Sequence, residues 1–268
     1  MTVRTEKQGG VWTVIHSRPE ARNAMDSASA EALVEAFLAF DRDPDAKVAV
    51  LWGEGGAFCA GFDLKQAAGN TGALDAIAYP STERTRPGEQ LPRGPMGPTR
   101  LELDKPVIAA IAGPAVAGGF EVALWCDVRV MERSAYFGVY CRRWGVPLID
   151  GGTVRLPRLV GAGRAMEIIL TGRKVTADEA LRIGACEQVV EDGASRAAAE
   201  AMAHEIARYP QACMRADRRS VHRQQGLGLR EAMRFEWANG VPAFFAEGAE
   251  GAARFAAGRG RHGDAGDI

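Results

Sequence analysis

The chain has 268 residues, of which 47% are hydrophobic, so it is long enough to bury one substantial core. Its 33 Lys and Arg residues nearly balance 34 Asp and Glu residues, giving a formal net charge of -1 without the basic surplus typical of nucleic-acid binding. The N-terminal segment lacks the apolar stretch of a signal peptide, and no apolar run reaches the ~18 residues of a membrane helix. We therefore expect neither a nucleic-acid partner nor a membrane partner.

Strands and helices alternate in the predicted order of the first two-thirds of the chain. Val11–His16 alternates apolar and polar residues, which is typical of a half-buried strand. Asp26 and Ser27 are expected to cap a helix whose apolar residues, from Leu33 to Leu38, recur at helical spacing. Three later apolar runs end in glycine or charge and predict buried strands: residues 47–53, 105–113 and 127–131.

One long segment interrupts this alternation. Residues 69–100 contain five glycines and five prolines, and few windows in the segment are compatible with a helix. A loop of this length is usually functional or disordered. A loop that covers a substrate and a loose insertion are equally good interpretations of it.

The later part of the chain is predicted to be helical. Thr176 and Glu179 form a capping box at the start of a helix that Gly184 ends. Beyond that helix the pattern soon becomes helical, with no convincing strand. We predict an α/β core over residues 1–195 and a helical region over residues 196–268.

The C-terminal region carries more large apolar residues than a short appendage can bury against itself. They include Phe235, Trp237, Phe244 and Phe245. We expect these side chains to pack partly on the core or on another subunit, which would make the protein an oligomer.

Five cysteines and four histidines bear on the cell compartment and on metal binding. The cysteines are odd in number, widely spaced and without a CxxC pair, which favours reduced thiols in the cytoplasm over a disulfide framework. The histidines show no ligand spacing, so we predict no metal site.

Two glycine-rich turns each follow a predicted buried strand, and the second carries an isolated carboxylate. The first spans residues 53–65, and in the second Gly118 and Gly119 open a helix that carries Glu121 within an apolar run. Two such turns could bring two backbone N–H donors together, which suits an oxyanion better than a phosphate because neither turn matches a phosphate-binding motif. Glu121 is either a carboxylate that gains from the helix dipole or a group that performs chemistry.

Several stretches, taken in order, resemble the enoyl-CoA hydratase/isomerase (crotonase) family. They are FCAGFDL, KPVIAAIAGPAVAGGFEVALWCD, AYFG with GVPLIDGGTVRLPRLVG, and LTGRKVTADEALRIGACEQVV. The resemblance begins at Arg18–Met25 and covers nearly the whole chain. It implies an α/β fold, a spiral of ββα units with a C-terminal helical region that builds homotrimers, often paired into hexamers.

The resemblance also implies an acyl-CoA thioester as the substrate, with coenzyme A as part of the substrate and no separate cofactor. The thioester oxygen would bind in an oxyanion hole formed by the backbone N–H groups of Phe62 and Gly118. The residues expected to line the CoA and thioester site are Phe62, Asp63, Leu64, Lys65 and Gly118. Glu121 falls on one of the two glutamates of the family's hydratases.

This resemblance gives Glu121 a chemical role. Removing an α-proton from a thioester, or adding water across its conjugated double bond, develops enolate charge that two N–H donors stabilise. The proton needs a carrier, and burial in an apolar pocket raises the pKa of a carboxylate toward a useful value. Glu121 is therefore our candidate acid/base.

The second glutamate of the hydratases is replaced in this sequence. It lies four residues after the phenylalanine of an FG pair, and the count from Phe137 reaches Cys141. We interpret Cys141 as a small buried residue because a thiol is a poor substitute for a carboxylate. Asp150 lies where the family's dienoyl-CoA isomerases carry an aspartate. It is either a second catalytic acid/base or, as we favour, the N-cap of the following helix.

Three functional hypotheses follow. The leading one is an acyl-CoA enzyme resembling the enoyl-CoA hydratases, a lyase of fatty-acid metabolism in which Glu121, alone or with Asp150, moves protons beside an enolate. The second is an enoyl-CoA isomerase, which needs only one proton shuttle, or a CoA-thioester hydrolase. The third is a non-catalytic acyl-CoA-binding or assembly protein. The glycine turns and Glu121 favour catalysis.

Overall fold

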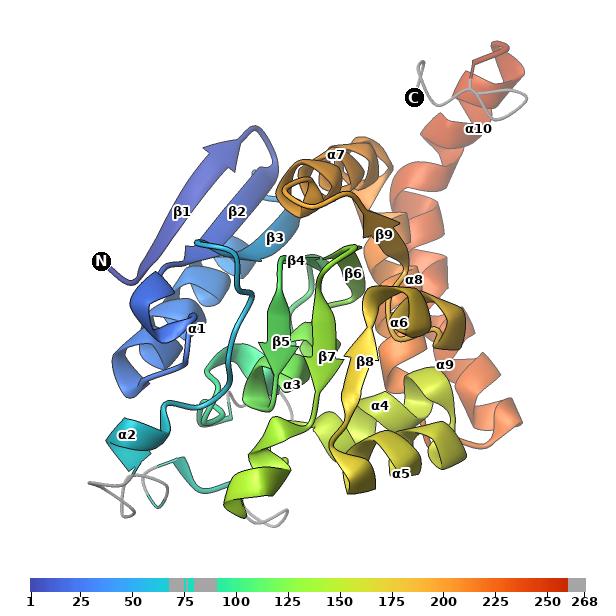
Figure 1. Cartoon of the computed structure of the whole chain (residues 1–268). Coiled ribbons are helices and arrows are strands. Elements are labelled where there is room, and N and C mark those ends of the chain that lie inside the picture. The colour runs from blue at the N-terminus through green and yellow to red at the C-terminus, as the bar shows by residue number, and fades with distance from the viewer. Residues whose placement is uncertain (68–74, 76, 80–90, 260–268) are drawn as a thin grey trace.

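The structure, a computed structural model, describes residues 1–67, 75, 77–79 and 91–259. Its main element is a six-stranded sheet in which β1 and β2 are antiparallel and the other neighbouring pairs are parallel (Figure 1). In sheet order the strands are β1 (Val3–Gln8), β2 (Val11–His16), β3 (Val48–Gly53), β4 (Val107–Ile111), β6 (Val128–Glu132) and β9 (Gln188–Val190). A smaller sheet has the order β5 (Pro114–Val116), β7 (Tyr136–Gly138) and β8 (Lys174–Thr176).

Ten α-helices occur in the described part of the chain. They are α1 (Ser27–Arg42), α2 (Leu64–Ala67), α3 (Gly118–Trp125), α4 (Gly152–Val160), α5 (Ala162–Thr171), α6 (Ala177–Ile183), α7 (Ser195–Arg208), α8 (Gln211–Arg223), α9 (Leu229–Ala243) and α10 (Ala249–Ala256). The predicted order of strands and helices is confirmed, and the region after Ser195 is helical as expected, up to the last described residue.

The predicted helix starts are confirmed in part. The Asp26 carboxylate accepts a hydrogen bond from the Ser29 N–H at the start of α1. The Thr176 hydroxyl accepts one from the Glu179 N–H at the start of α6. The other half of the predicted capping box differs, because the Glu179 carboxylate forms an ion pair with Arg173.

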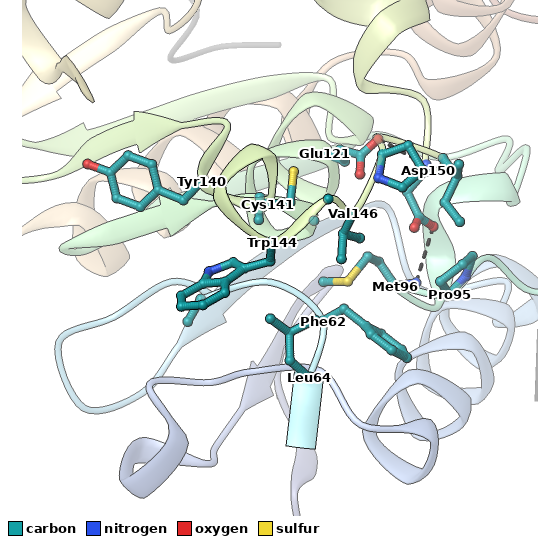
Figure 2. A pocket seen from close by; sticks show the side chains of 16 residues that line it. Phe62, Leu64, Pro95, Met96, Glu121, Tyr140, Cys141, Trp144, Val146 and Asp150 are labelled. Atoms are coloured by element: carbon teal, nitrogen blue, oxygen red, sulfur yellow. Dashed lines mark hydrogen bonds between the residues drawn. The ribbon is translucent and has the colours of Figure 1, made fainter. Parts of the chain in front are cut away.

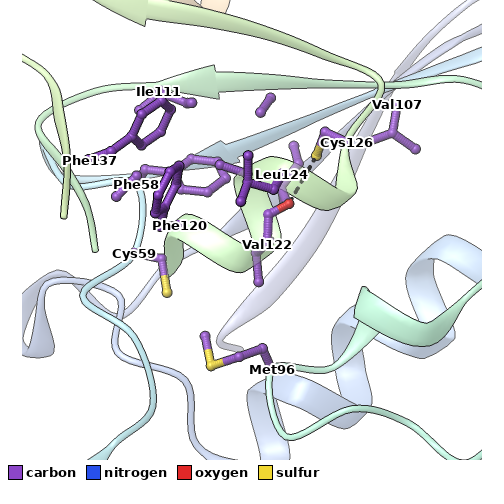
Figure 3. Packing of buried hydrophobic residues seen from close by; sticks show 14 of the residues in the cluster. Phe58, Cys59, Met96, Val107, Ile111, Phe120, Val122, Leu124, Cys126 and Phe137 are labelled. Atoms are coloured by element: carbon purple, nitrogen blue, oxygen red, sulfur yellow. Dashed lines mark hydrogen bonds between the residues drawn. The ribbon is translucent and has the colours of Figure 1, made fainter. Parts of the chain in front are cut away.

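The large sheet is covered on both faces. Alternate residues of β3 face opposite ways, so Val48 and Val50 pack against α7 while Ala49 and Leu51 join the larger cluster that includes α1 and α3. Figure 3 shows the part of this cluster around α3, where the rings of Phe120 and Phe137 stack with centroids 4.4 Å apart. The cluster therefore holds α3 firmly against the strands.

The prediction of a half-buried first strand is wrong. Every residue of β2 is buried, including the polar Thr13 and His16. The reason is α7, which covers the face that was expected to be in solvent, and the Thr13 hydroxyl donates to Glu200 of that helix. Because α7 begins at Ser195 and packs on the sheet, the predicted domain boundary between residues 195 and 196 separates two segments that contact each other. The division into two domains stays a prediction.

The C-terminal helices expose large apolar side chains. Figure 1 shows α10 projecting away from the sheets. Trp237, Phe244 and Phe245 are 74%, 67% and 77% exposed, and Phe235 is half-buried. Packing of the first three on the core of the same chain, one of the two expected outcomes, does not occur; packing on another subunit stays a prediction. No helix within the described ranges is both long enough and apolar enough to cross a membrane.

Candidate active site

A cavity of about 330 Å³ lies between the start of α3 and the segment that leads into α4 (Figure 2). Its walls are mostly apolar, and the carboxylates of Glu121 and Asp150 lie at one end, with Trp144, Phe62 and Leu64 on other sides. Such a cavity, apolar with a few converging polar groups, is typical of a small-molecule site. Residues 95 and 96, from the long segment over residues 69–100, also line it; most of the rest of that segment lies outside the described residues.

The start of α3 is strained where it meets the cavity. Ala117 has φ +53° and ψ -125°, a conformation that residues with a side chain rarely adopt. Its N–H donates to the Gly138 carbonyl of β7 at 2.8 Å, which holds the turn in place. The helix therefore begins directly after β5, with the Gly118 N–H at its first position, where it has no acceptor within the helix.

The second predicted donor, Phe62, lies beside this helix start. Met25 and Phe62 form a parallel bridge whose hydrogen bonds are made by the two neighbours of Phe62: the Met25 N–H donates to the Gly61 carbonyl, and the Asp63 N–H donates to the Met25 carbonyl. The Phe62 N–H is therefore directed away from Met25. A Cβ added to Gly61, which has φ +97°, would lie 3.2 Å from the Gly118 nitrogen. The two backbone segments are thus adjacent, and both Phe62 and Gly118 line the cavity.

Glu121 occupies the first turn of α3 and is 2% exposed. Its Oε1 accepts hydrogen bonds from the Asp150 N–H at 2.9 Å and the Gly152 N–H at 2.8 Å. Burial raises the pKa of Glu121 from 4.5 to about 7, and the nearby Asp150 charge adds to this, although the two N–H donors oppose it. Near neutral pH the group can therefore either accept or donate a proton.

Asp150 is also buried, with 4% exposure, but its side chain does not cap α4. The N-cap position of α4 is Gly151, without a side-chain hydrogen bond. The Asp150 Oδ1 instead accepts from the Met96 N–H at 3.1 Å and the Thr99 hydroxyl at 2.5 Å. The favoured interpretation of Asp150 as a helix cap is wrong, because its carboxylate turns toward a segment about 50 residues earlier in the chain. Burial raises the pKa of Asp150 despite these hydrogen bonds.

Cys141 lies in the short helical turn Tyr140–Trp144 and lines the same cavity. It is buried, as predicted. Burial and the nearby Glu121 charge raise the pKa of its thiol, so the group stays protonated at neutral pH. Cys141 therefore lines the same cavity as Glu121 without carrying a charge.

The segment expected to contact CoA divides into two parts. Phe62 and Leu64 line the cavity together with Gly118. Asp63 does not line it; its carboxylate forms an ion pair with Arg18 at 3.1 Å. Lys65 is exposed on α2, outside the cavity lining.

Sequence reasoning missed three residues that hold the site together. Met96 and Thr99 donate hydrogen bonds to the Asp150 carboxylate. Arg155 donates to the backbone carbonyls of Asp150 and Thr99. Met96 and Thr99 lie in the glycine- and proline-rich segment, where no local pattern marks them. Arg155 follows a Gly-Gly pair after Asp150, which was the one available signal. Within the described residues, no group of three or more His, Cys, Asp or Glu side chains could hold a metal ion.

Known proteins resemble this chain along most of its length. The sequence model of the family described as enoyl-CoA hydratase/isomerase matches residues 6–260. Enoyl-CoA hydratase EchA19 of Mycobacterium tuberculosis is 34% identical over 94% of this chain and 92% of its own length. The (E)-benzylidenesuccinyl-CoA hydratase of Thauera aromatica is 38% identical over 77% of each chain.

The fold agrees as well. The crystal structure of an enoyl-CoA hydratase from Mycobacterium tuberculosis matches with a TM-score of 0.85 at 32% identity, covering 96% of each chain. The expected fold class, crotonase-like α/β with helices at the C-terminus, is thereby confirmed. With a family match over almost its whole length, and relatives above 30% identity along most of it, the chain belongs to the enoyl-CoA hydratase/isomerase family.

Proposed function

We propose that this protein is an enoyl-CoA hydratase that uses Glu121 as its acid/base. The observation that carries the proposal is the position of Glu121: a buried carboxyl with a pKa of about 7, facing the same cavity as the strained start of α3. The hydratases named among its relatives support the choice of reaction.

The proposed reaction adds water across the double bond of a 2-enoyl-CoA thioester. Ionised Glu121 takes a proton from water as the water oxygen bonds to C3, and the double-bond electrons move onto the thioester oxygen as an enolate. The N–H groups of Phe62 and Gly118 would stabilise that oxygen, and one such donor is worth about a hundredfold to a thousandfold in rate. A proton returned to C2 completes the addition. Coenzyme A takes part only as the handle of the substrate.

The hydrogen bonds of Glu121 support this division of labour. Because Oε1 already accepts two N–H bonds, Oε2 is the oxygen available to exchange a proton. Asp150, with its raised pKa and its place in the same cavity, is our candidate for the group that, in its protonated form, donates a proton to C2. Proton exchange with solvent would then return Glu121 to its ionised form and Asp150 to its protonated form. Glu121 could also return the proton itself.

Double-bond isomerisation is the second candidate, and the Cys141 position favours it. An isomerase moves one proton between two carbons of the acyl chain and needs no water-activating pair. A protonated thiol where hydratases have a glutamate would therefore harm isomerisation less than hydration. CoA-thioester hydrolysis and non-catalytic acyl-CoA binding are the remaining outcomes to test.

A panel of CoA thioesters tests these candidates directly. The panel contains 2-enoyl and 3-enoyl substrates with straight-chain and phenyl-bearing acyl groups, and products are separated by chromatography. A 3-hydroxyacyl product supports hydration, a shifted double bond supports isomerisation, and free CoA supports hydrolysis. Binding without turnover of any substrate would contradict an enzymatic function. Glu121→Gln, which keeps both N–H bonds but cannot accept the proton, is the matched control.

We also propose that the protein is a cytoplasmic homotrimer or hexamer. Exposed Trp237, Phe244 and Phe245 lie on or next to α9, and another subunit is the partner that would cover them. Analytical ultracentrifugation at micromolar concentration tests the assembly. A pure monomer would contradict it.

A further inference from the structure

Arg155 binds the main chain beside the carboxyl groups of the site but hydrogen-bonds to neither of them. It belongs to the first turns of α4, and its guanidinium donates to the Asp150 carbonyl at 2.9 Å and to the Thr99 carbonyl at 2.7 Å. The loop is wrapped closely around it: Gly151 has φ +99°, and a Cβ there would lie 2.1 Å from the Arg155 Nη1. The side chain is partly buried, and burial lowers its pKa.

The two carbonyls belong to the two segments that hold the candidate acids. The loop Asp150–Gly152 supplies both N–H groups that bind Glu121. The segment Met96–Thr99 supplies both donors that bind the Asp150 carboxylate. A planar guanidinium can bind two carbonyls at a fixed angle, which an ammonium group or an amide cannot do in the same way.

We propose that Arg155 is a positioning residue that ties these two segments together and so fixes the positions of the Glu121 and Asp150 carboxyl groups relative to each other. This inference rests on the proposed acid/base function of the two groups. Arg155 is not itself a lining residue of the cavity, and in the proposed reaction it does not touch the reacting atoms.

The cation has a second effect, on proton affinity. Its charge opposes the rise in pKa of both Glu121 and Asp150. The other titratable or charged groups that interact with one of these three residues are Arg100, Cys126, Cys141 and the exposed Arg158, which acts on Arg155. Burial raises the pKa of both thiols, so they remain neutral. Arg155 is the cation that acts on both acids.

Two substitutions separate position from charge. Arg155→Lys keeps the charge but loses the two-carbonyl fork, so we expect kcat to fall at least tenfold with little change in KM and in the pH profile. Arg155→Gln loses both, so kcat should fall by about a hundredfold, the size of effect that a misplacement of about 1 Å produces. The acidic limb of the pH profile of kcat for Arg155→Gln should also move to higher pH by about one unit, because the cation that favours the ionised carboxyls has been removed.

Arg158→Gln is the matched control, since it removes an exposed arginine from the same helix. It should leave kcat and the pH profile unchanged. Thermal melting reports the folded fraction of each variant, and a loss of stability with unchanged kcat per folded enzyme would overturn the proposal. If Arg155→Gln does not fold, Arg155→Lys decides alone: wild-type kcat overturns the proposal.

A wild-type enzyme that turns over no enoyl-CoA would refute the proposed function but would leave Arg155 testable. The pKa of Glu121 can then be followed by NMR of protein labelled with 13C in its glutamate carboxyls. A higher pKa in Arg155→Gln than in the wild type supports the electrostatic contact, and an unchanged pKa overturns the proposal.

Discussion

A carboxylate lies near each end of α3, one buried and one partly buried, and the two behave in opposite ways. Glu121 lies in the first turn, beside the cavity, and its pKa is raised to about 7. Asp127 lies two residues after the last turn, between the core and α8. Burial raises its pKa too, but hydrogen bonds from His222, Arg218 and the Val107 N–H outweigh burial, so the pKa is lowered.

The difference comes from the charge of the hydrogen-bond donors. Asp127 is bound by a guanidinium at 3.0 Å and an imidazole at 2.9 Å, so its carboxylate stays ionised and anchors α8 to the core. Glu121 is bound by two neutral N–H groups, while Arg155, whose charge also acts on it, is engaged with carbonyls. A buried acid therefore becomes a fixed anchor or a titratable group according to whether cations or neutral donors bind it.

The largest effect should separate the two acids by activity. Glu121→Gln should lower turnover about a hundredfold to ten-thousandfold, because it removes the proton carrier, while binding of the CoA ester is kept. Asp127→Asn should leave the turnover per folded molecule close to that of the wild type. Steady-state kinetics with ligand titration measures both. Unchanged turnover in Glu121→Gln would make Glu121 a structural residue.

The next effect should separate them by stability. Asp127→Asn leaves the Arg218 guanidinium without its counter-ion, and we expect a loss of about 2–3 kcal/mol in the free energy of unfolding. Denaturant unfolding at neutral pH measures this loss. A stable Asp127→Asn protein would show that α8 is held by its apolar contacts alone.

The pH dependence of stability should have opposite signs at the two sites. The folded pKa of Glu121 lies above its unfolded value of 4.5, so its contribution to stability is present below pH 4.5 and is lost as the pH rises to about 7. Glu121→Gln should therefore be more stable than the wild type at pH 8, by about 2 kcal/mol, and gain little at pH 4.5.

Asp127 has a lowered pKa, so its contribution to stability is present above pH 3.8, its unfolded pKa, and is lost as the pH falls through its folded pKa. The defect of Asp127→Asn should shrink in acid. Thermal melts of both variants across this pH range measure the two slopes. Slopes of the same sign would contradict the comparison.

The smallest effect is expected at Cys141. Cys141→Ala removes a protonated thiol from the cavity wall without changing charge, so turnover should stay within about twofold of the wild type, as for other substitutions that add no charge or clash. The same kinetic assay measures it. A large loss of turnover would instead place the thiol in the proton-transfer path opposite Glu121.

Local patterns in the sequence predicted the elements and the first acid. Asp26 caps α1 and Val48–Gly53 forms a buried strand because capping and hydrophobic periodicity depend on neighbours a few residues away. Glu121 stood out because a lone carboxylate in an apolar helix start is costly unless it is paired or in use, although the local pattern alone left a helix-dipole role open. The family resemblance then predicted an acyl-CoA thioester as the substrate.

Contacts between distant segments decided the rest. The solvent face of β2 is covered by α7, nearly 190 residues later in the chain, which no alternation within β2 can reveal. Asp150 has the local environment of a helix cap, yet Thr99 and Met96, 51 and 54 residues away, bind its carboxylate instead. The sequence by itself determined β2, β3, β4 and β6, the helices α1, α3 and α6, and the helical nature of the C-terminal region. Only the tertiary structure decided the neighbours of Asp150 and Arg155, because those neighbours come from parts of the chain that meet only after folding.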